Sequence, residues 1–144
     1  MIEIRSVQTA EDILFCSRAI LSLRPMVNAE MLVEQTQRMM RQGFEMLYIA
    51  NNNNTSAAAV AGYRTFEMYR MGKTIYIDDL FSLPESRGKG FAGALLDHIY
   101  LTALNAGIKT VHIDSGYDLH PGHSLFLNRG YILPCHHFVK IIVD

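Results

Sequence analysis

Apolar residues alternate with polar ones in some segments and recur every three or four residues in others, which separates predicted strands from predicted helices. Residues 2–8 alternate and predict a first strand. From Ala10 the apolar positions follow helical spacing, and Pro25 ends that helix. A second helix begins after the capping residue Asn28 and ends at Gly43.

The remaining pattern predicts five strand segments and two helices, which complete the order β-α-α-β-β-β-α-β-α-β. The strands are expected at residues 44–50, 57–68, 74–82 and 109–115, the helices at residues 91–106 and 121–130, and a last strand region at residues 131–143. The helix over residues 91–106 should bury Leu95, Leu96, Ile99 and Ala103. No repeat or low-complexity linker divides the chain, so we expect a single α/β domain over residues 1–144.

Composition narrows the class of protein. A chain of 144 residues with 49% hydrophobic residues can bury one sizeable core. The formal charge of -1, with both signs interspersed, favours neither nucleic acid nor an anionic membrane as a partner. The apolar runs are too short to span a membrane, and the first residues read as a strand rather than a signal peptide, so we expect a cytoplasmic protein.

Cysteine and histidine spacing gives little support to a metal site. Cys16 and Cys135 lie far apart and are expected to be buried apolar residues. His120 and His123 could share a helical face, but no third ligand is set by local spacing. We therefore expect no metal, and consider these imidazoles as substrate contacts or proton relays.

The segment between the strand at residues 74–82 and the next helix carries the most specific signal. Arg87, Gly88, Lys89 and Gly90 lead directly into that helix. Small residues leave backbone N–H groups free to point outward, and the helix adds its own first-turn donors and the positive end of its dipole. Nucleoside triphosphate and dinucleotide loops have other glycine spacings, which this chain lacks. The segment predicts a pyrophosphate-binding turn, with a glycine-rich surface turn as the alternative.

Residues 87–92 have the form Arg/Gln-x-x-Gly-x-Gly/Ala, which resembles the acyl-CoA loop of the GNAT superfamily of N-acetyltransferases. The predicted element order resembles that family along nearly the whole chain. Residues 76–80, 112–116, 120–123 and 136–138 are similar to strings of a bacterial GNAT subgroup. The resemblance implies a GNAT fold, in which a mixed central sheet splays where two parallel middle strands part.

The resemblance also implies acetyl-CoA as co-substrate and assigns residues to it. The loop amides would hold the pyrophosphate, and the end of the preceding strand would pair its backbone with the pantetheine arm. The implied cofactor-binding residues are Leu80, Phe81, Ser82, Arg87, Gly88, Lys89, Gly90, Phe91, Ala92, Gly93 and Phe126.

Transfer of an acetyl group to an amine needs a group that takes the ammonium proton. Strand alternation places Asp114 with His112 on one face of what should be an interior strand, where a carboxylate must be paired or catalytic. Asp114 is the first candidate base, and a structural carboxylate is the alternative. Asp78 and Asp79 should face opposite sides of their strand, and Asp79 is the second candidate. His120 and His123 complete the catalytic candidates, with Tyr117 and Asp118 as further acceptor contacts.

Phe126 departs from the family pattern, which has a tyrosine here whose hydroxyl donates to the CoA sulfur. Phenylalanine has no such proton. Two functions therefore stay open. The first is an N-acyltransferase that moves acetyl from acetyl-CoA to a small-molecule amine or a protein amino group by direct attack in a ternary complex. The alternative is a non-catalytic CoA-binding regulatory or sensor module. The oligomeric state stays open between a monomer and a homodimer.

Overall fold

The computed structural model describes residues 1–116 and 120–143. The chain forms two compact units, residues 1–114 and residues 115–144. The first unit contains a five-stranded sheet. Its strands, in spatial order, are β1 (Arg5–Ser6), β2 (Phe44–Ala50), β3 (Ala57–Met68), β4 (Gly72–Ser82) and β5 (Thr110–Ile113). Pairing is antiparallel from β1 to β4 and parallel between β4 and β5. The expected α/β class with a mixed sheet is confirmed.

Strands β4 and β5 part halfway along β4. Residues 74–77 of β4 pair with residues 110–113 of β5, whereas β4 continues to Ser82. Within the described residues, positions 78–82 of β4 therefore pair only with β3. This is the expected splay, although β5 is the last strand of the described sheet rather than an interior one. Among the described residues, this edge of β4 therefore has no strand beside it next to the point of divergence.

A β-bulge at Asp78 changes the alternation of β4. Gly62 of β3 lies opposite Asp79, but the next residue, Tyr63, lies opposite Ile77. Asp78 is thus the extra residue of the bulge. The prediction that Asp78 and Asp79 face strictly opposite sides rested on unbroken alternation, which the bulge removes.

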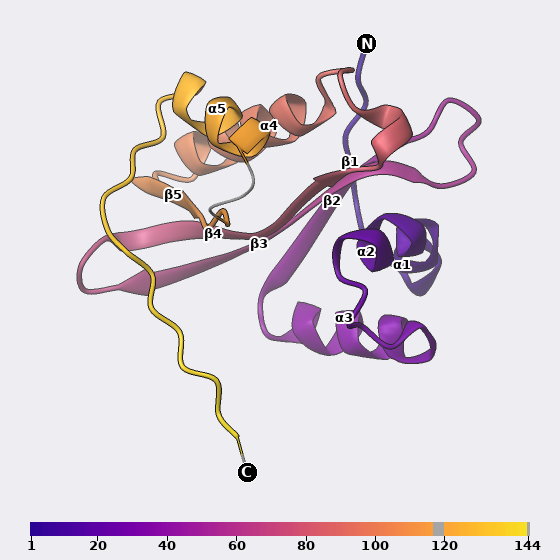
Figure 1. Ribbon diagram of the computed structural model, residues 1–144, viewed down its shortest axis with the longest axis horizontal. Coiled ribbons are helices and arrows are strands. Elements are labelled where there is room, and N and C mark those ends of the chain that lie inside the picture. The colour runs from indigo at the N-terminus through magenta and orange to yellow at the C-terminus, as the bar shows by residue number, and fades with distance from the viewer. Residues whose placement is uncertain (117–119, 144) are drawn as a thin grey trace. The chain divides into compact units, whose positions relative to one another are not determined.

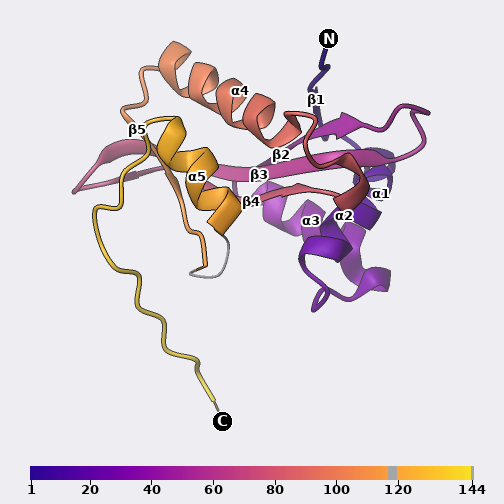
Figure 2. The same ribbon diagram turned by 45° about the horizontal axis from the view of Figure 1, so that its top comes forward.

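Helices cover both faces of the sheet in the first unit. Helices α1 (Ala10–Phe15), α2 (Ser17–Leu23) and α3 (Leu32–Arg41) lie on one face, and α4 (Phe91–Asn105) lies on the other (Figures 1 and 2). Short 3₁₀ turns, Ala29–Met31 and Pro84–Ser86, precede α3 and the loop before α4. As predicted, Leu95, Leu96, Ile99 and Ala103 of α4 are buried, and Gly107 follows the helix with a positive φ of 71°.

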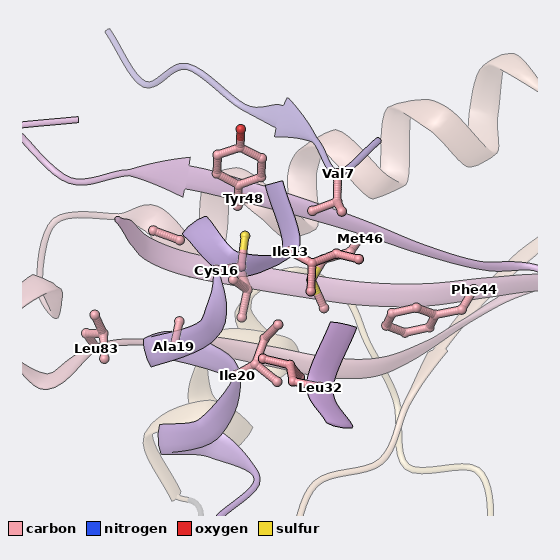
Figure 3. Close-up of a cluster of buried hydrophobic side chains, with 12 residues drawn as sticks. Val7, Ile13, Cys16, Ala19, Ile20, Leu32, Phe44, Met46, Tyr48 and Leu83 are labelled. Carbon is pink, nitrogen blue, oxygen red and sulfur yellow. The ribbon is translucent and has the colours of Figure 1, made fainter. Parts of the chain in front are cut away.

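The core between the sheet and α1–α3 is built by the helical periodicity of the sequence. Ile13, Cys16 and Ile20 of the helical segments lie in one buried cluster with Phe44, Met46 and Tyr48 of β2 (Figure 3). Cys16 has no exposed surface, as expected of a buried apolar residue. Burial raises the pKa of its thiol to about 12, and the charge of Asp12 adds to that rise. This packing anchors the end of α2, from which Arg24 reaches the sheet.

The second unit differs from the prediction in its last segment. Helix α5 (His120–Asn128) is present, but the described residues 131–143 contain no strand. A strand exists only when its backbone pairs with another, and Pro134 removes one of the donors that pairing needs. Cys135, expected to be buried, is exposed in the same segment. The predicted single domain over residues 1–144 stays a prediction.

Candidate active site

The loop before α4 presents a row of backbone donors. Gly88 and Gly90 have positive φ angles of 78° and 80°, which glycine adopts without strain. Gly90 is the N-cap residue of α4 but offers no side-chain cap, and the first backbone bond of the helix runs from the N–H of Ala94 to the Gly90 carbonyl at 3.0 Å. No N–H of residues 88–93 donates to a backbone carbonyl among the described residues. This arrangement fits an anion such as a pyrophosphate.

No other protein atom fills the space beside the two loop glycines, Gly88 and Gly90. A Cβ atom built on Gly88 or Gly90 meets no atom within 4 Å. Arg87 places its guanidinium 5.8 Å from the centre of the Phe81 ring, and its Nε donates to the Ser82 carbonyl at 3.4 Å. The loop and the end of β4 are therefore joined through Arg87. The residues that the sequence assigned to the cofactor, except Phe126, lie together along this part of the first unit.

A small hollow of about 240 Å³ lies beside the same loop. Its lining residues are Asn51, Asn52, Asn53, Ala58, Glu85, Ser86, Lys89 and Phe91. Asn51 closes the β2–β3 turn by accepting hydrogen bonds from the backbone N–H of Thr55 at 2.8 Å and of Ser56 at 3.5 Å. The asparagine-rich turn is therefore a fixed neighbour of the loop, which the sequence pattern did not indicate.

Asp79 lies in a cluster of charges at the β4 bulge. Nε of Arg24 donates to Oδ1 of Asp79 at 2.8 Å, and Nη2 of Arg24 donates to the Asp78 carbonyl at 3.0 Å. The Asp79 side chain is 18% exposed. Burial raises the pKa of the Asp79 carboxyl, and the Arg24 guanidinium opposes that rise. Arg24 thus fixes both the bulge and the carboxylate, at the end of α2.

A second arginine completes the cluster. Nε of Arg64 donates to Oδ2 of Asp78 at 2.8 Å, and its guanidinium lies 5.3 Å from the centre of the Phe44 ring. The Phe44 ring fits there because residue 62 is a glycine. A Cβ at Gly62 would come within 2.4 Å of the Phe44 side chain and 3.3 Å of Oδ2 of Asp79. The two carboxylates and two guanidiniums form one network, so neither aspartate acts as an isolated charge.

Asp114 follows β5 and is exposed. The Tyr76 hydroxyl donates to its Oδ1 at 2.7 Å. His112, opposite Tyr76 in the parallel pair, stacks on the Tyr76 ring with 5.6 Å between centroids and 6° between planes. Nε2 of His112 also lies 3.1 Å from Oγ1 of Thr110. The predicted grouping of His112 and Asp114 is present, and Tyr76 is the residue that joins them.

The remaining candidates belong to the second unit. His120 begins α5, and Nε2 of His123 donates to the Gly116 carbonyl at 2.7 Å. Phe126 packs against Tyr131 with 5.8 Å between ring centroids. Tyr117 and Asp118 lie outside the described residues. The catalytic candidates thus come from both units, Asp79 and Asp114 from the first, His120 and His123 from the second.

The described part of the chain contains neither a cluster of metal ligands nor a membrane-spanning helix. No group of three or more His, Cys, Asp or Glu side chains could hold a metal ion among residues 1–116 and 120–143. No helix in those ranges is long and apolar enough to cross a membrane.

Solved structures with the same architecture are acetyltransferases by name. The ribosomal-protein-alanine N-acetyltransferase of Brucella melitensis matches with a TM-score of 0.82 and 14% identity, over 97% of this chain and 99% of that one. The aminoglycoside 6′-N-acetyltransferase AAC(6′)-Ih of Acinetobacter baumannii matches with a TM-score of 0.78 and 17% identity, over 99% and 100%. AAC(6′)-Iy, solved with a CoA-containing bisubstrate analogue, matches with a TM-score of 0.83 and 12% identity, over 100% and 99%. The fold is that of the GNAT acetyltransferases.

The sequence gives the same assignment independently. The model of the acetyltransferase (GNAT) family matches residues 10–131, which is most of the chain. The comparison with curated proteins gives no match. The chain belongs to the acetyltransferase (GNAT) family.

Sequence reasoning missed Arg24, Arg64 and Tyr76 as parts of the site. Arg24 is separated from Asp79 by 55 residues, and Tyr76 from Asp114 by 38, so no local spacing connects them. A signal for Tyr76 existed, because it shares the 76–80 string with the two aspartates. The bulge that gathers the charges leaves no mark in the alternation of residues 74–82.

Proposed function

We propose that the protein moves an acetyl group from acetyl-CoA to a primary amine by direct attack of the amine in a ternary complex. The observation that carries the proposal is the continuity of two features in the first unit. No N–H of residues 88–93 donates to a backbone carbonyl among the described residues, a Cβ built on Gly88 or Gly90 meets no atom within 4 Å, and residues 78–82 of β4 have β3 as their only strand partner there. The loop suits a pyrophosphate, and the strand edge suits an amide-containing arm.

Asp114 takes the role of the group that accepts the ammonium proton, directly or through water. The hydrogen bond from Tyr76 orients its carboxylate, and exposure leaves it accessible to an acceptor. Asp79 is the second candidate, held by Arg24 near the diverging strands. His120 and His123 stay candidates for substrate contact or proton transfer, and Phe126 for contact with the thioester end.

The acceptor is a small-molecule amine or a protein amino group. The name of one structural neighbour refers to aminoglycosides and that of another to a ribosomal-protein alanine, so the fold serves both kinds of acceptor. We expect the protein to act in the cytoplasm and to need neither nucleic acid nor a membrane.

Thiol release tests the proposal. Purified protein is mixed with acetyl-CoA and a panel of primary amines, and free CoA is measured over time. Amine-dependent release, with acetylated amine found by mass spectrometry, is the expected result. Binding of acetyl-CoA by calorimetry without release from any amine would favour the CoA-binding sensor, the function that the loss of a tyrosine at Phe126 suggests.

A further inference from the structure

The four charges at the β4 bulge cancel. Arg24 pairs with Asp79 at 2.8 Å and Arg64 pairs with Asp78 at 2.8 Å. Each pair is a direct Nε-to-carboxylate contact, and Arg24 also bonds to the bulge carbonyl. The pairs are partly buried, with the Asp79 and Asp78 side chains 18% and 26% exposed. The bulge therefore carries two carboxylates but no net charge.

The additional ammonium groups of a polycationic acceptor would bind best to carboxylates that are not already paired with an arginine. Opposite charges a few ångströms apart attract, while a second cation beside a guanidinium is repelled by a similar amount. Specificity in charged sites depends on such repulsion as much as on attraction. The Arg24 side chain is 45% exposed, so an approaching ligand meets the guanidinium as well as the carboxylate. The neutral bulge therefore gives an additional positive charge no net attraction.

The position of the bulge makes this relevant to the acceptor. Asp78 and Asp79 come directly after the last residue of β4 that pairs with β5, Ile77. They also directly precede Leu80, which begins the edge assigned to the pantetheine arm. If the thioester lies along that edge, an amine that attacks it must pass the Arg24–Asp79 pair.

We propose that Arg24 is a specificity-determining residue that neutralises Asp79 and so denies polycationic amines a carboxylate contact, which makes the enzyme favour acceptors whose reacting amine is their only positive charge. This inference rests on the proposed function, because it takes the bulge as part of the acceptor site. It identifies the substrate class as monocationic amines, whether small molecules or single protein amino groups.

A matched pair of acceptors tests the proposal. Butylamine and 1,4-diaminobutane have the same carbon chain and differ by one ammonium group. At saturating acetyl-CoA, kcat/KM is measured for each, and the ratio of monoamine to diamine is the readout. The wild-type ratio should be one or more, because the neutral bulge gives the second ammonium no net attraction. Arg24→Gln should reduce the ratio by about tenfold, because it leaves the Asp79 charge open to the second ammonium.

Three further variants separate the effect of the Arg24 charge from the effect of its shape. Arg24→Lys keeps the positive charge but loses the two-point contact, so the ratio should stay close to wild type even if both rates fall. Arg38→Gln removes the same charge from an exposed position on α3 and should leave the ratio unchanged. Asp79→Asn leaves Arg24 uncompensated and should increase the preference for the monoamine, whatever it does to the rates. If Arg24→Gln does not fold, the ratio measured for Asp79→Asn alone tests the role of Arg24.

The outcomes distinguish this inference from the proposed function. Acetylation with a wild-type preference for the diamine, or with a ratio insensitive to both Arg24→Gln and Asp79→Asn, overturns the role of Arg24 and leaves the acetyltransferase intact. If no amine releases thiol, the proposed activity fails, and calorimetry of the same two amines with the CoA-bound protein becomes the readout. Binding of the monoamine at least as tight as that of the diamine then supports the charge selection, and tighter binding of the diamine, or no binding of either, overturns it.

Discussion

The Tyr76 hydroxyl donates a hydrogen bond of 2.7 Å to Oδ1 of Asp114 across the two parallel strands of the sheet. Tyr76 is itself fixed, because its ring stacks on His112 on one side and lies 6.2 Å from Phe66 on the other. A carboxylate that is held by a rigid donor keeps one orientation toward solvent and toward any bound acceptor. Tyr76 is therefore a positioning residue for Asp114.

If Asp114 accepts the proton of the acceptor, Asp114→Asn should lower kcat by about a hundredfold and leave the KM for acetyl-CoA nearly unchanged. The rise of kcat with pH should flatten as well. Tyr76→Phe should cost less, about five- to tenfold in kcat, because the carboxylate stays in place and loses only the hydrogen bond that orients it. Steady-state kinetics at several pH values measures both effects. Asp97→Asn, at an exposed position on α4, controls for the loss of a carboxylate. A normal kcat in Asp114→Asn would move the role of base to Asp79, a histidine or water.

The cofactor loop gives a second prediction, with a control at the other end of the same helix. Gly90 and Gly107 have positive φ angles of 80° and 71°, and a Cβ built on either meets no atom within 4 Å. Alanine should therefore cost the same backbone strain at both, about 1–2 kcal/mol. Only at Gly90 should the methyl group intrude on bound phosphate. Calorimetry should show acetyl-CoA binding weakened by tenfold or more in Gly90→Ala and unchanged in Gly107→Ala. Equal affinities in the two folded variants would remove the pyrophosphate from this loop.

Local patterns predicted most of the elements because each is set by neighbouring residues. The periodicity of α4 and its glycine end were visible, and the strands at residues 44–50 and 57–68 match their predicted bounds. The turn chemistry of Asn28 was also visible: its side chain accepts from the Glu30 N–H at 2.9 Å. Such features need no knowledge of the rest of the chain.

Features that depend on partners distant in sequence were not predictable. The bulge at Asp78 is defined by its register against β3, and the Arg24–Asp79 pair by the packing of α2 on the sheet. The segment at residues 131–143 has the composition of a strand but no strand partner among the described residues. Sequence reasoning therefore predicted the loop before α4 as a cofactor site and named two candidate carboxylates, but it did not find the arginines and the tyrosine that hold these carboxylates.

Acid titration of Asp12 offers a test of the first helix. Asp12 accepts backbone hydrogen bonds from Gln8 at 2.8 Å and Thr9 at 3.1 Å, as part of a capping box. The bond from Gln8 is the main cause that lowers the pKa of the Asp12 carboxyl. A lowered pKa in the folded state gives stability above the unfolded pKa of about 3.9, which is lost as the pH falls through the folded value. Asp12→Ala should unfold about 1 kcal/mol more easily at pH 7, and the difference should shrink below about pH 4. Urea unfolding measures it, with Glu11→Ala as the control.

Thiol labelling distinguishes the two cysteines. Burial raises the Cys16 pKa to about 12, so its thiol is both protonated and inaccessible in the folded protein. Cys135 is exposed. A disulfide reagent at pH 8 should modify one thiol per native chain, and Cys135→Ser should abolish that reaction while leaving Cys16 reactive only after denaturation. Rapid labelling of Cys16 in the folded protein would show that the α1–α2 core opens easily.

Phe126 gives the most specific test of catalysis, because the family pattern has a tyrosine whose hydroxyl donates to the departing sulfur. If thiolate departure limits the rate, Phe126→Tyr should raise kcat by roughly tenfold, below the range usual for a positioned acid. If His123 supplies the proton instead, that change should do little and His123→Ala should reduce kcat. The ring of His123 is oriented by its hydrogen bond to the Gly116 carbonyl at 2.7 Å. His123 and Phe126 are three residues apart on α5 and can share a face of that helix. Measuring kcat for both variants with one amine separates these mechanisms. A protein that only binds CoA should show no amine-dependent thiol release in either variant, and acetyl-CoA found bound away from Phe126 would rule out both.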